Sequence, residues 1–120
     1  MLVRCLMFPV LCAVAAHALD LKNAVVVATP AEKKVAAMLT GEIEKRTRIR
    51  LAVTDRPPAA GPSIVLSGHP AIAAVPGADG YRIQVVNGSV QLAGNDGRGT
   101  LFAAGALLRN LQMDRDSLAI

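Results

Sequence analysis

Aromatic residues are almost absent from this 120-residue sequence, which has no tryptophan, one tyrosine and two phenylalanines. Proteins that bind single-stranded nucleic acid use aromatic side chains on which bases stack, and the sequence offers no such platform. The formal net charge is +4, with basic residues gathered at positions 45–50. Cations are favoured at the end of a helix, so we interpret this cluster as a solvated edge and expect no nucleic-acid partner.

Cysteine is also scarce, and both copies, Cys5 and Cys12, lie near the N-terminus. Residues 1–4 are short and basic, residues 5–16 form an apolar run, and Ala16-His17-Ala18 has the small-x-small pattern of a cleavage site. These features predict a signal peptide over residues 1–18, cleaved after Ala18. The run is too short to span a bilayer, so we expect no membrane segment after cleavage and an exported protein, periplasmic or extracellular.

The remaining stretch, residues 19–120, contains no cysteine and therefore no disulfide or thiol chemistry. Its only histidine is His69, and no motif places metal-ligating or triad partners beside it. The loop Gly94–Gly99 has neither the dinucleotide-binding spacing nor a Walker lysine. No pair of carboxylates is fixed in a pocket by the sequence. We therefore expect no catalytic residues, no cofactor-binding residues and no metal ligands.

A β-hairpin is the clearest pattern present, because Asn87-Gly88 separates two strand-like segments, and this dipeptide favours a two-residue type I′ turn. The turn places Val86 opposite Ser89 and Gln84 opposite Gln91. The resulting register sorts the side chains onto two faces. The apolar face comprises Ile83, Val85, Val90 and Leu92.

Further segments predict an α+β fold with one mixed sheet and two main helices packed on one face. A capping box at Thr29-Pro30-Ala31-Glu32 begins a helix that continues to about Arg46. The element order is β-α-β-β-β-β-α, with a possible final strand. The strands expected outside the hairpin are Ala24–Ala28, which we expect to be covered on both faces, Arg48–Val53, Ile64–Leu66 and Ser117–Ile120.

The second helix, expected over residues 101–108 after a cap at Asn95 or Asp96, carries no charged or amide side chain. Such a helix must be covered on most of its circumference. One sheet cannot enclose every large side chain on it, so we predict an exposed apolar patch of the kind that marks interfaces. The interface residues predicted here are Leu101, Phe102, Leu107 and Leu108.

The hairpin and second helix, GYRIQVVNGSVQLAGNDGRGTLFAAGALLRNL, resemble the end of a small α+β domain found in certain glycoside hydrolases. These are the β-N-acetylhexosaminidases and the α-glucuronidases. In that pattern a tyrosine-led strand, a turn and a strand with an aspartate ending precede Arg-Gly-x-x-aromatic and a Leu-Leu pair. The resemblance extends over about residues 22–120. Its counterparts in this chain are Tyr81, Leu92, Asp96, Arg98, Gly99, Phe102, Leu107 and Leu108.

The resemblance implies that residues 19–120 form a non-catalytic accessory domain. In the family this domain packs against a catalytic (β/α)8 barrel, which we expect C-terminal to Ile120. The chain itself would then carry no hydrolase activity, and the enzyme assignment for this polypeptide stays open. The alternative is a stand-alone exported carbohydrate-binding or protein-interaction module, although Tyr81 is the only candidate aromatic for stacking on a sugar ring.

Overall fold

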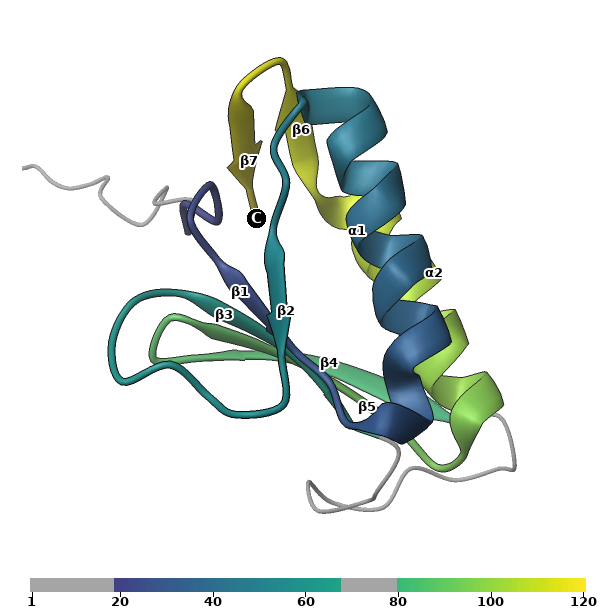
Figure 1. Ribbon diagram of the computed structural model, residues 1–120. Helices are drawn as coiled ribbons and strands as arrows, with labels where there is room; N and C mark the ends of the chain where they lie inside the picture. Colours follow the sequence, from purple (N-terminus) through teal and green to yellow (C-terminus); the bar gives the residue numbers. More distant parts are fainter. Residues whose placement is uncertain (1–18, 68–79) are drawn as a thin grey trace, which may run out of the picture.

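A computed structural model describes residues 19–67 and 80–120 (Figure 1). The predicted signal peptide and His69 lie outside these residues. The elements follow the order β1 (Val25–Val27), the 3-10 turn η2 (Pro30–Glu32), α1 (Lys33–Thr47), β2 (Ala52–Thr54), β3 (Ser63–Ser67), β4 (Tyr81–Val86), β5 (Ser89–Gly94), α2 (Gly97–Asn110), β6 (Gln112–Asp114) and β7 (Ser117–Ala119).

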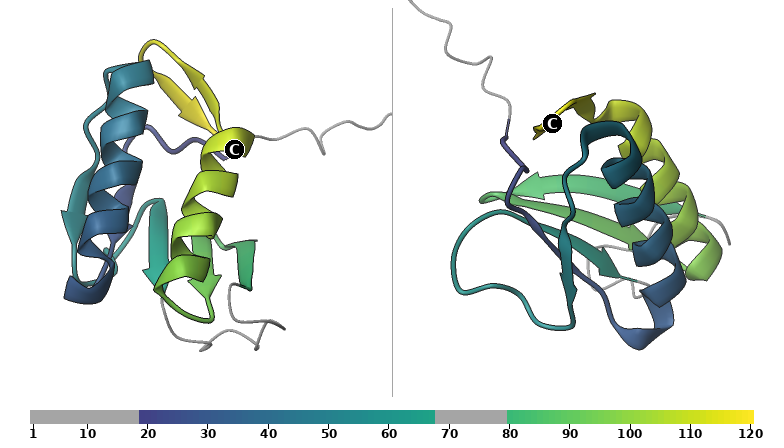
Figure 2. Two further views of the ribbon diagram at one scale, coloured as in Figure 1. Left: turned by 90° about the vertical axis from the view of Figure 1, so that its right-hand side faces the viewer. Right: turned by 45° about the horizontal axis from the view of Figure 1, so that its top comes forward.

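Five of the strands form one mixed sheet in the order β2-β1-β3-β5-β4. Strand β1 pairs in parallel with β2 and β3, β3 pairs in parallel with β5, and β4 and β5 are antiparallel. Parallel neighbours cannot be joined by a tight turn, and α1 supplies the connection from β1 to β2. Both helices cover the same face of the sheet (Figure 2). The predicted α+β class and the mixed sheet are confirmed.

The first βα unit forms where the sequence predicted it. Val26 and Val27 point to opposite faces of the sheet and are both buried, so β1 is covered on both sides. At the start of η2 the Thr29 hydroxyl and backbone N–H donate to the same Glu32 carboxylate oxygen, at 2.7 and 3.1 Å. This contact confirms the capping box and gives the buried Glu32 carboxylate a partner.

The second predicted strand is shorter than expected. Arg48 ends α1 in the left-handed conformation, with φ of 66°, so the chain must turn before it can extend. Ile49 and Leu51 are buried but precede β2, which begins only at Ala52. The prediction of a strand from Arg48 was therefore wrong at its N-terminal end, because the helix C-cap uses those residues.

The hairpin register is confirmed at every predicted pair, since Val86 lies opposite Ser89, Gln84 opposite Gln91, and Ile83 opposite Leu92. The apolar face is not buried along its whole length: Val85 is 52% exposed, whereas Val90 opposite it is fully buried. Strand β4 is the last strand of the sheet, and its turn-proximal end extends past the cover that the helices provide.

Helix α2 is longer than the predicted segment because the glycines before Leu101 are helical. The Asp96 carboxylate accepts a hydrogen bond from the Gly99 N–H at 2.8 Å, which places the N-cap at Asp96. A Cβ on Gly99 would collide with the Gly80 carbonyl oxygen, and one on Gly94 would collide with the Thr100 backbone. These two glycines let the start of α2 approach the sheet closely.

The core lies between the sheet and the two helices. Ile64 aligns with Val26 on one side and Val90 on the other, and all three side chains are fully buried. The helices cover this row with side chains that are also fully buried, namely Leu39, Ile43, Ala103, Ala104 and Leu107. The side of α1 that carries Leu39 and Ile43 therefore faces the sheet.

The C-terminal end of the chain forms a second, two-stranded sheet from β6 and β7. The strand expected over Ser117–Ile120 is present, but β6 was not predicted. The Leu19 N–H donates to the Ile120 carbonyl at 2.8 Å, the Ile120 N–H returns a bond to the Leu19 carbonyl at 3.0 Å, and the Asp116 N–H donates to the Thr47 carbonyl at 2.7 Å. The hairpin is thereby attached to the first described residues and to the end of α1.

Candidate interaction surface

The outward side of α2 carries two large apolar side chains that the rest of the described chain leaves open. Leu101 is 43% exposed and Phe102 is 45% exposed, whereas Leu108 is half-buried and packs against the core. Leu107 is fully buried. Of the four predicted interface residues, the structure therefore places Leu107 inside this domain and not on its surface, because it lies on the side of the helix that faces the sheet.

Leu101 and Phe102 lie on opposite flanks of the exposed side. Gly99 abuts Gly80, the residue before β4, and Phe102 is three positions further along the helix, so it lies on the same flank. Leu101 and Leu108 are seven positions apart and share the other flank. Helix α1 and strand β4 lie on opposite sides of α2 (Figure 2). Phe102 is therefore on the β4 side and Leu101 on the α1 side.

Helix α1 extends this apolar surface only in part. Val35 and Met38 are half-buried and pack against the core. The outer face of α1 is charged, with Glu42 paired to Lys45 at 3.3 Å and to Arg46 at 3.6 Å. The outer side of α2 also carries exposed arginines, Arg98 and Arg109. It differs from α1 in exposing the large apolar side chains of Leu101 and Phe102, which makes it the better surface for burial against another body.

Strand β4 exposes three large side chains. Tyr81, the candidate exposed aromatic of the sequence analysis, is 38% exposed, and Val86 is 37% exposed, in addition to Val85. The sequence pattern assigned Val85 to the apolar face and did not predict the exposure of Val86, because exposure depends on strand order and the sequence does not specify that β4 lies at an edge. The turn signal alone could have shown only that the two strands pair.

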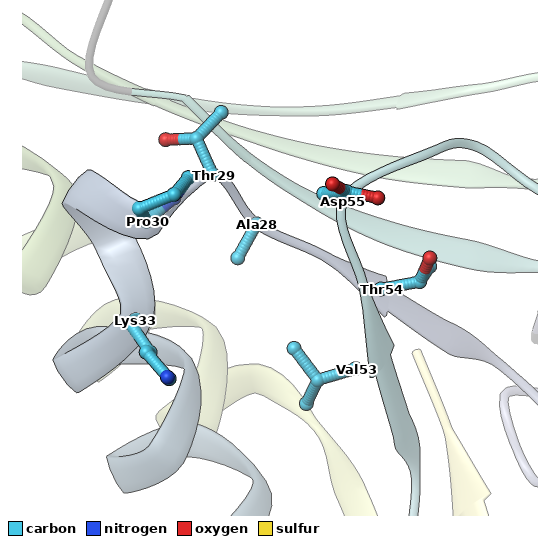
Figure 3. Close-up of a pocket in the computed structure, with 7 residues that line it drawn as sticks. All are labelled: Ala28, Thr29, Pro30, Lys33, Val53, Thr54 and Asp55. Atoms are coloured by element: carbon cyan, nitrogen blue, oxygen red, sulfur yellow. The ribbon is translucent and has the colours of Figure 1, made fainter.

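A shallow pocket of about 220 Å³ lies where β1 and β2 end beside the start of α1 (Figure 3). Lys33 and Asp55 come from opposite walls of this pocket, and the Thr29 hydroxyl already donates to Glu32. This mixture of one cation, one carboxylate and small side chains assigns no particular ligand. The pocket is lined by Ala28, Thr29, Pro30, Lys33, Val53, Thr54 and Asp55.

Catalytic and metal chemistry find no support in the part of the chain that the structure describes. No cluster of three or more histidine, cysteine or acidic side chains that could hold a metal ion occurs among residues 19–67 and 80–120. Within the same residues, no helix has both the length and the apolar character needed to cross a membrane. The interaction surface on α2 is accordingly the strongest candidate for a functional feature.

A comparison with protein families finds one match, described as glycosyl hydrolase family 20, domain 2, over residues 8–119. The match begins inside the predicted signal peptide, so it does not test the boundary at Ala18. A search of curated proteins finds no match. Of the two enzyme groups that the sequence resembles, the family match corresponds to the hexosaminidase type, in which this domain is non-catalytic and N-terminal. The chain belongs to the domain 2 family of glycosyl hydrolase family 20.

Proposed function

We propose that this domain packs against a catalytic barrel and positions it, and that the outward side of α2 is the docking surface. The chain is an accessory domain of the glycoside hydrolase type by its family. The single observation that supports docking through α2 is the exposure of Leu101 and Phe102 on a helix that is otherwise well packed. The barrel is expected C-terminal to Ile120.

The energetic argument favours an apolar partner for this surface. Full burial of a leucine or phenylalanine side chain contributes about 1.5–3 kcal/mol, so covering the exposed part of Leu101 and Phe102 contributes about 1 kcal/mol each. Leu108 adds a half-buried neighbour on the same flank as Leu101. Exposed apolar residues that are contiguous on one helix mark interfaces more often than residues scattered singly.

We also propose that the protein is exported and that residues 1–18 are removed. Leu19, the residue that would become the new N-terminus, exchanges two backbone hydrogen bonds with Ile120. Cleavage after Ala18 would keep both of these hydrogen bonds. The measurement is fractionation of a bacterial expression host followed by N-terminal sequencing of the exported protein. A mature product beginning at Leu19 supports the proposal, and retention in the cytoplasm at full length would contradict it.

Docking is tested by mixing the purified protein with a separately expressed catalytic barrel of a family 20 hexosaminidase and measuring binding by calorimetry. The test variant is Leu101→Ser/Phe102→Ser, because both residues are exposed and their replacement leaves the core intact. We expect the double substitution to weaken binding by about tenfold or more, from the loss of about 2 kcal/mol of burial.

The matched control is Val53→Ser on β2, since Val53 is also apolar and is 49% exposed but lies at the other edge of the sheet. This control should bind the barrel like the parent protein. Equal weakening by Val53→Ser would show a nonspecific apolar effect, and no binding by the parent protein would contradict docking through α2. A stand-alone module would instead bind a polysaccharide ligand without any barrel, a result that affinity electrophoresis in polysaccharide gels would reveal.

A further inference from the structure

Strand β4 is a long open edge of the sheet. It has six residues and ends the strand order, whereas β2 at the other edge has only three. Among the described residues, no strand pairs with the outer side of β4. An exposed edge strand with apolar side chains is a template for pairing with another chain.

The hairpin turn determines which backbone groups of β4 point outward. Asn87 and Gly88 both have positive φ, 48° and 81°, as a type I′ turn requires. In such a hairpin the residues flanking the turn bond to each other, and every second residue does the same. Arg82, Gln84 and Val86 therefore bond toward β5. The N–H and C=O groups of the alternate residues point away from β5, and these residues are Tyr81, Ile83 and Val85.

The same alternate residues carry the apolar side chains of β4 on the helix-covered face. Tyr81 and Val85 are 38% and 52% exposed, and Ile83 between them is half-buried against the core. On the opposite face, the side-chain amide oxygen Oε1 of Gln84 is buried and has no hydrogen-bond donor among residues 19–67 and 80–120. The exposed Arg82 side chain, two residues away on the same face, provides guanidinium donors.

We propose that β4 pairs with β4 of a second copy of this chain, antiparallel and with Ile83 on the two-fold axis. This register places Tyr81 opposite Val85 of the second copy, and the reverse pair follows from the symmetry. All outward backbone groups of the three alternate residues are then paired. On the other face, Arg82 lies opposite Gln84 of the second copy, so that a cationic and a neutral polar side chain meet and like charges are not placed opposite each other.

The register follows from complementarity in both the backbone and the side chains. Moving the axis by two residues in the N-terminal direction takes the pairing beyond Tyr81. Moving it to Gln84 leaves Tyr81 opposite the turn residue Asn87 and separates Arg82 from Gln84 of the second copy. Only the register centred on Ile83 pairs the exposed Tyr81 and Val85 with each other and places Arg82 opposite Gln84.

The test uses two single substitutions at exposed positions, Tyr81→Lys and Val85→Glu, and measures self-association of the purified chain by sedimentation over a range of concentrations. We expect a concentration-dependent dimer in the parent protein. Each substitution occurs twice across a two-fold interface, so each alone should raise the dimer dissociation constant by about tenfold. An equimolar mixture of the two variants should recover association, because the introduced ammonium and carboxylate lie directly opposite each other.

The matched control is Val53→Lys, which places a charge at the other edge of the sheet and should leave the dimer unchanged. Circular dichroism of each variant checks that the fold is retained. A parent chain that stays monomeric at all concentrations overturns the proposal, as does a dimer that neither β4 substitution weakens. Failure of the mixture to associate, when both single variants are folded and weakened, overturns the register.

Discussion

The two helices begin in the same way but have opposite surfaces. Each follows a strand of the sheet, and near each start a carboxylate accepts a backbone N–H: Glu32 accepts from Thr29 in the 3-10 turn before α1, and Asp96 accepts from Gly99 in α2. The outer face of α1 carries ion pairs, whereas the outer side of α2 exposes Leu101 and Phe102 in addition to Arg98 and Arg109. Start signals in the sequence therefore establish that a helix forms, while the composition of the outer face decides whether it meets water or another protein surface.

The largest expected effect separates the buried side of α2 from its exposed side: truncating a buried side chain should destabilise the fold, and truncating an exposed one should not. Leu107→Ala should reduce the free energy of unfolding by about 2–5 kcal/mol, because the side chain is fully buried and leaves a cavity. Phe102→Ala should change it far less in the isolated chain, since nearly half of the ring already contacts water. Urea denaturation followed by circular dichroism measures both. Similar losses for the two variants would mean that Phe102 is covered within this chain.

The second prediction compares a glycine in each helix, because the two should respond to alanine in opposite directions. Gly99→Ala in α2 should reduce the free energy of unfolding by about 1–3 kcal/mol, because the new methyl group would overlap the Gly80 carbonyl and force a backbone shift. Gly41→Ala in α1 is the matched control, since no atom lies within 4 Å of the new methyl group. It should raise the free energy of unfolding by about 0.5–1 kcal/mol. Equal signs in the two measurements would contradict the close contact at the start of α2.

Local signals explain why so much of the fold could be predicted. The Asn87-Gly88 turn fixed every pair in its hairpin, and the capping residues Thr29 and Asp96 marked both helix starts, because these effects act within a few residues. The sequence did not reveal that β4 lies at an edge, so the exposure of Val85 was missed. Nor did it distinguish Leu107 from its neighbours on α2, because the direction of the sheet depends on contacts distant in the chain.

The amino-acid composition of the second helix predicted that an interaction surface exists, but not which of its residues are exposed. The uncharged segment 101–108 predicted that some of its surface needs a partner, but four large side chains were named where the structure exposes two. The helix is longer than this segment and includes Arg98 and Arg109. The buried and exposed sectors of α2 are set by the Gly99 contact with Gly80, which joins residues that no periodicity in the sequence connects. The predicted docking to a barrel stays a prediction, because the described chain contains only one side of that contact.

Removing the side chains that bond at the two helix starts should reduce the free energy of unfolding by no more than the Gly99 substitution does. Asp96→Ala deletes the acceptor for the Gly99 N–H and should reduce the free energy of unfolding by about 1 kcal/mol. Thr29→Ala deletes the hydroxyl that donates to the buried Glu32 carboxylate and should cost about 1–3 kcal/mol. Thermal unfolding followed by circular dichroism provides both values. A negligible effect at Asp96 would show that α2 is held by packing alone and does not depend on its cap.

The smallest expected effect lies in the charged surface associated with α1. An Arg50 guanidinium N–H donates to the Glu44 carboxylate at 3.1 Å, and this hydrogen bond, with the attraction between the charges, raises the pKa of Arg50. A group whose pKa is raised on folding stabilises the fold below its ordinary pKa and loses that contribution only as pH rises through the folded value. Between about pH 5 and pH 9 the arginine contribution is therefore constant.

Glu44→Gln should accordingly leave the unfolding midpoint unchanged within error, because Arg50 is largely exposed in this pair and water screens the attraction. Glu42→Gln is the matched control within α1, since it removes the contacts with Lys45 and Arg46 and should be equally mild. A clear loss of stability in either variant, measured at low and at high salt, would mean that the charges of α1 hold the fold. The charged outer face of α1 would then contribute to the stability of the fold as well as keep the helix in contact with water. An unchanged midpoint supports the opposite conclusion: the charges keep the outer face of α1 in water, and the surface suited to docking is left on α2.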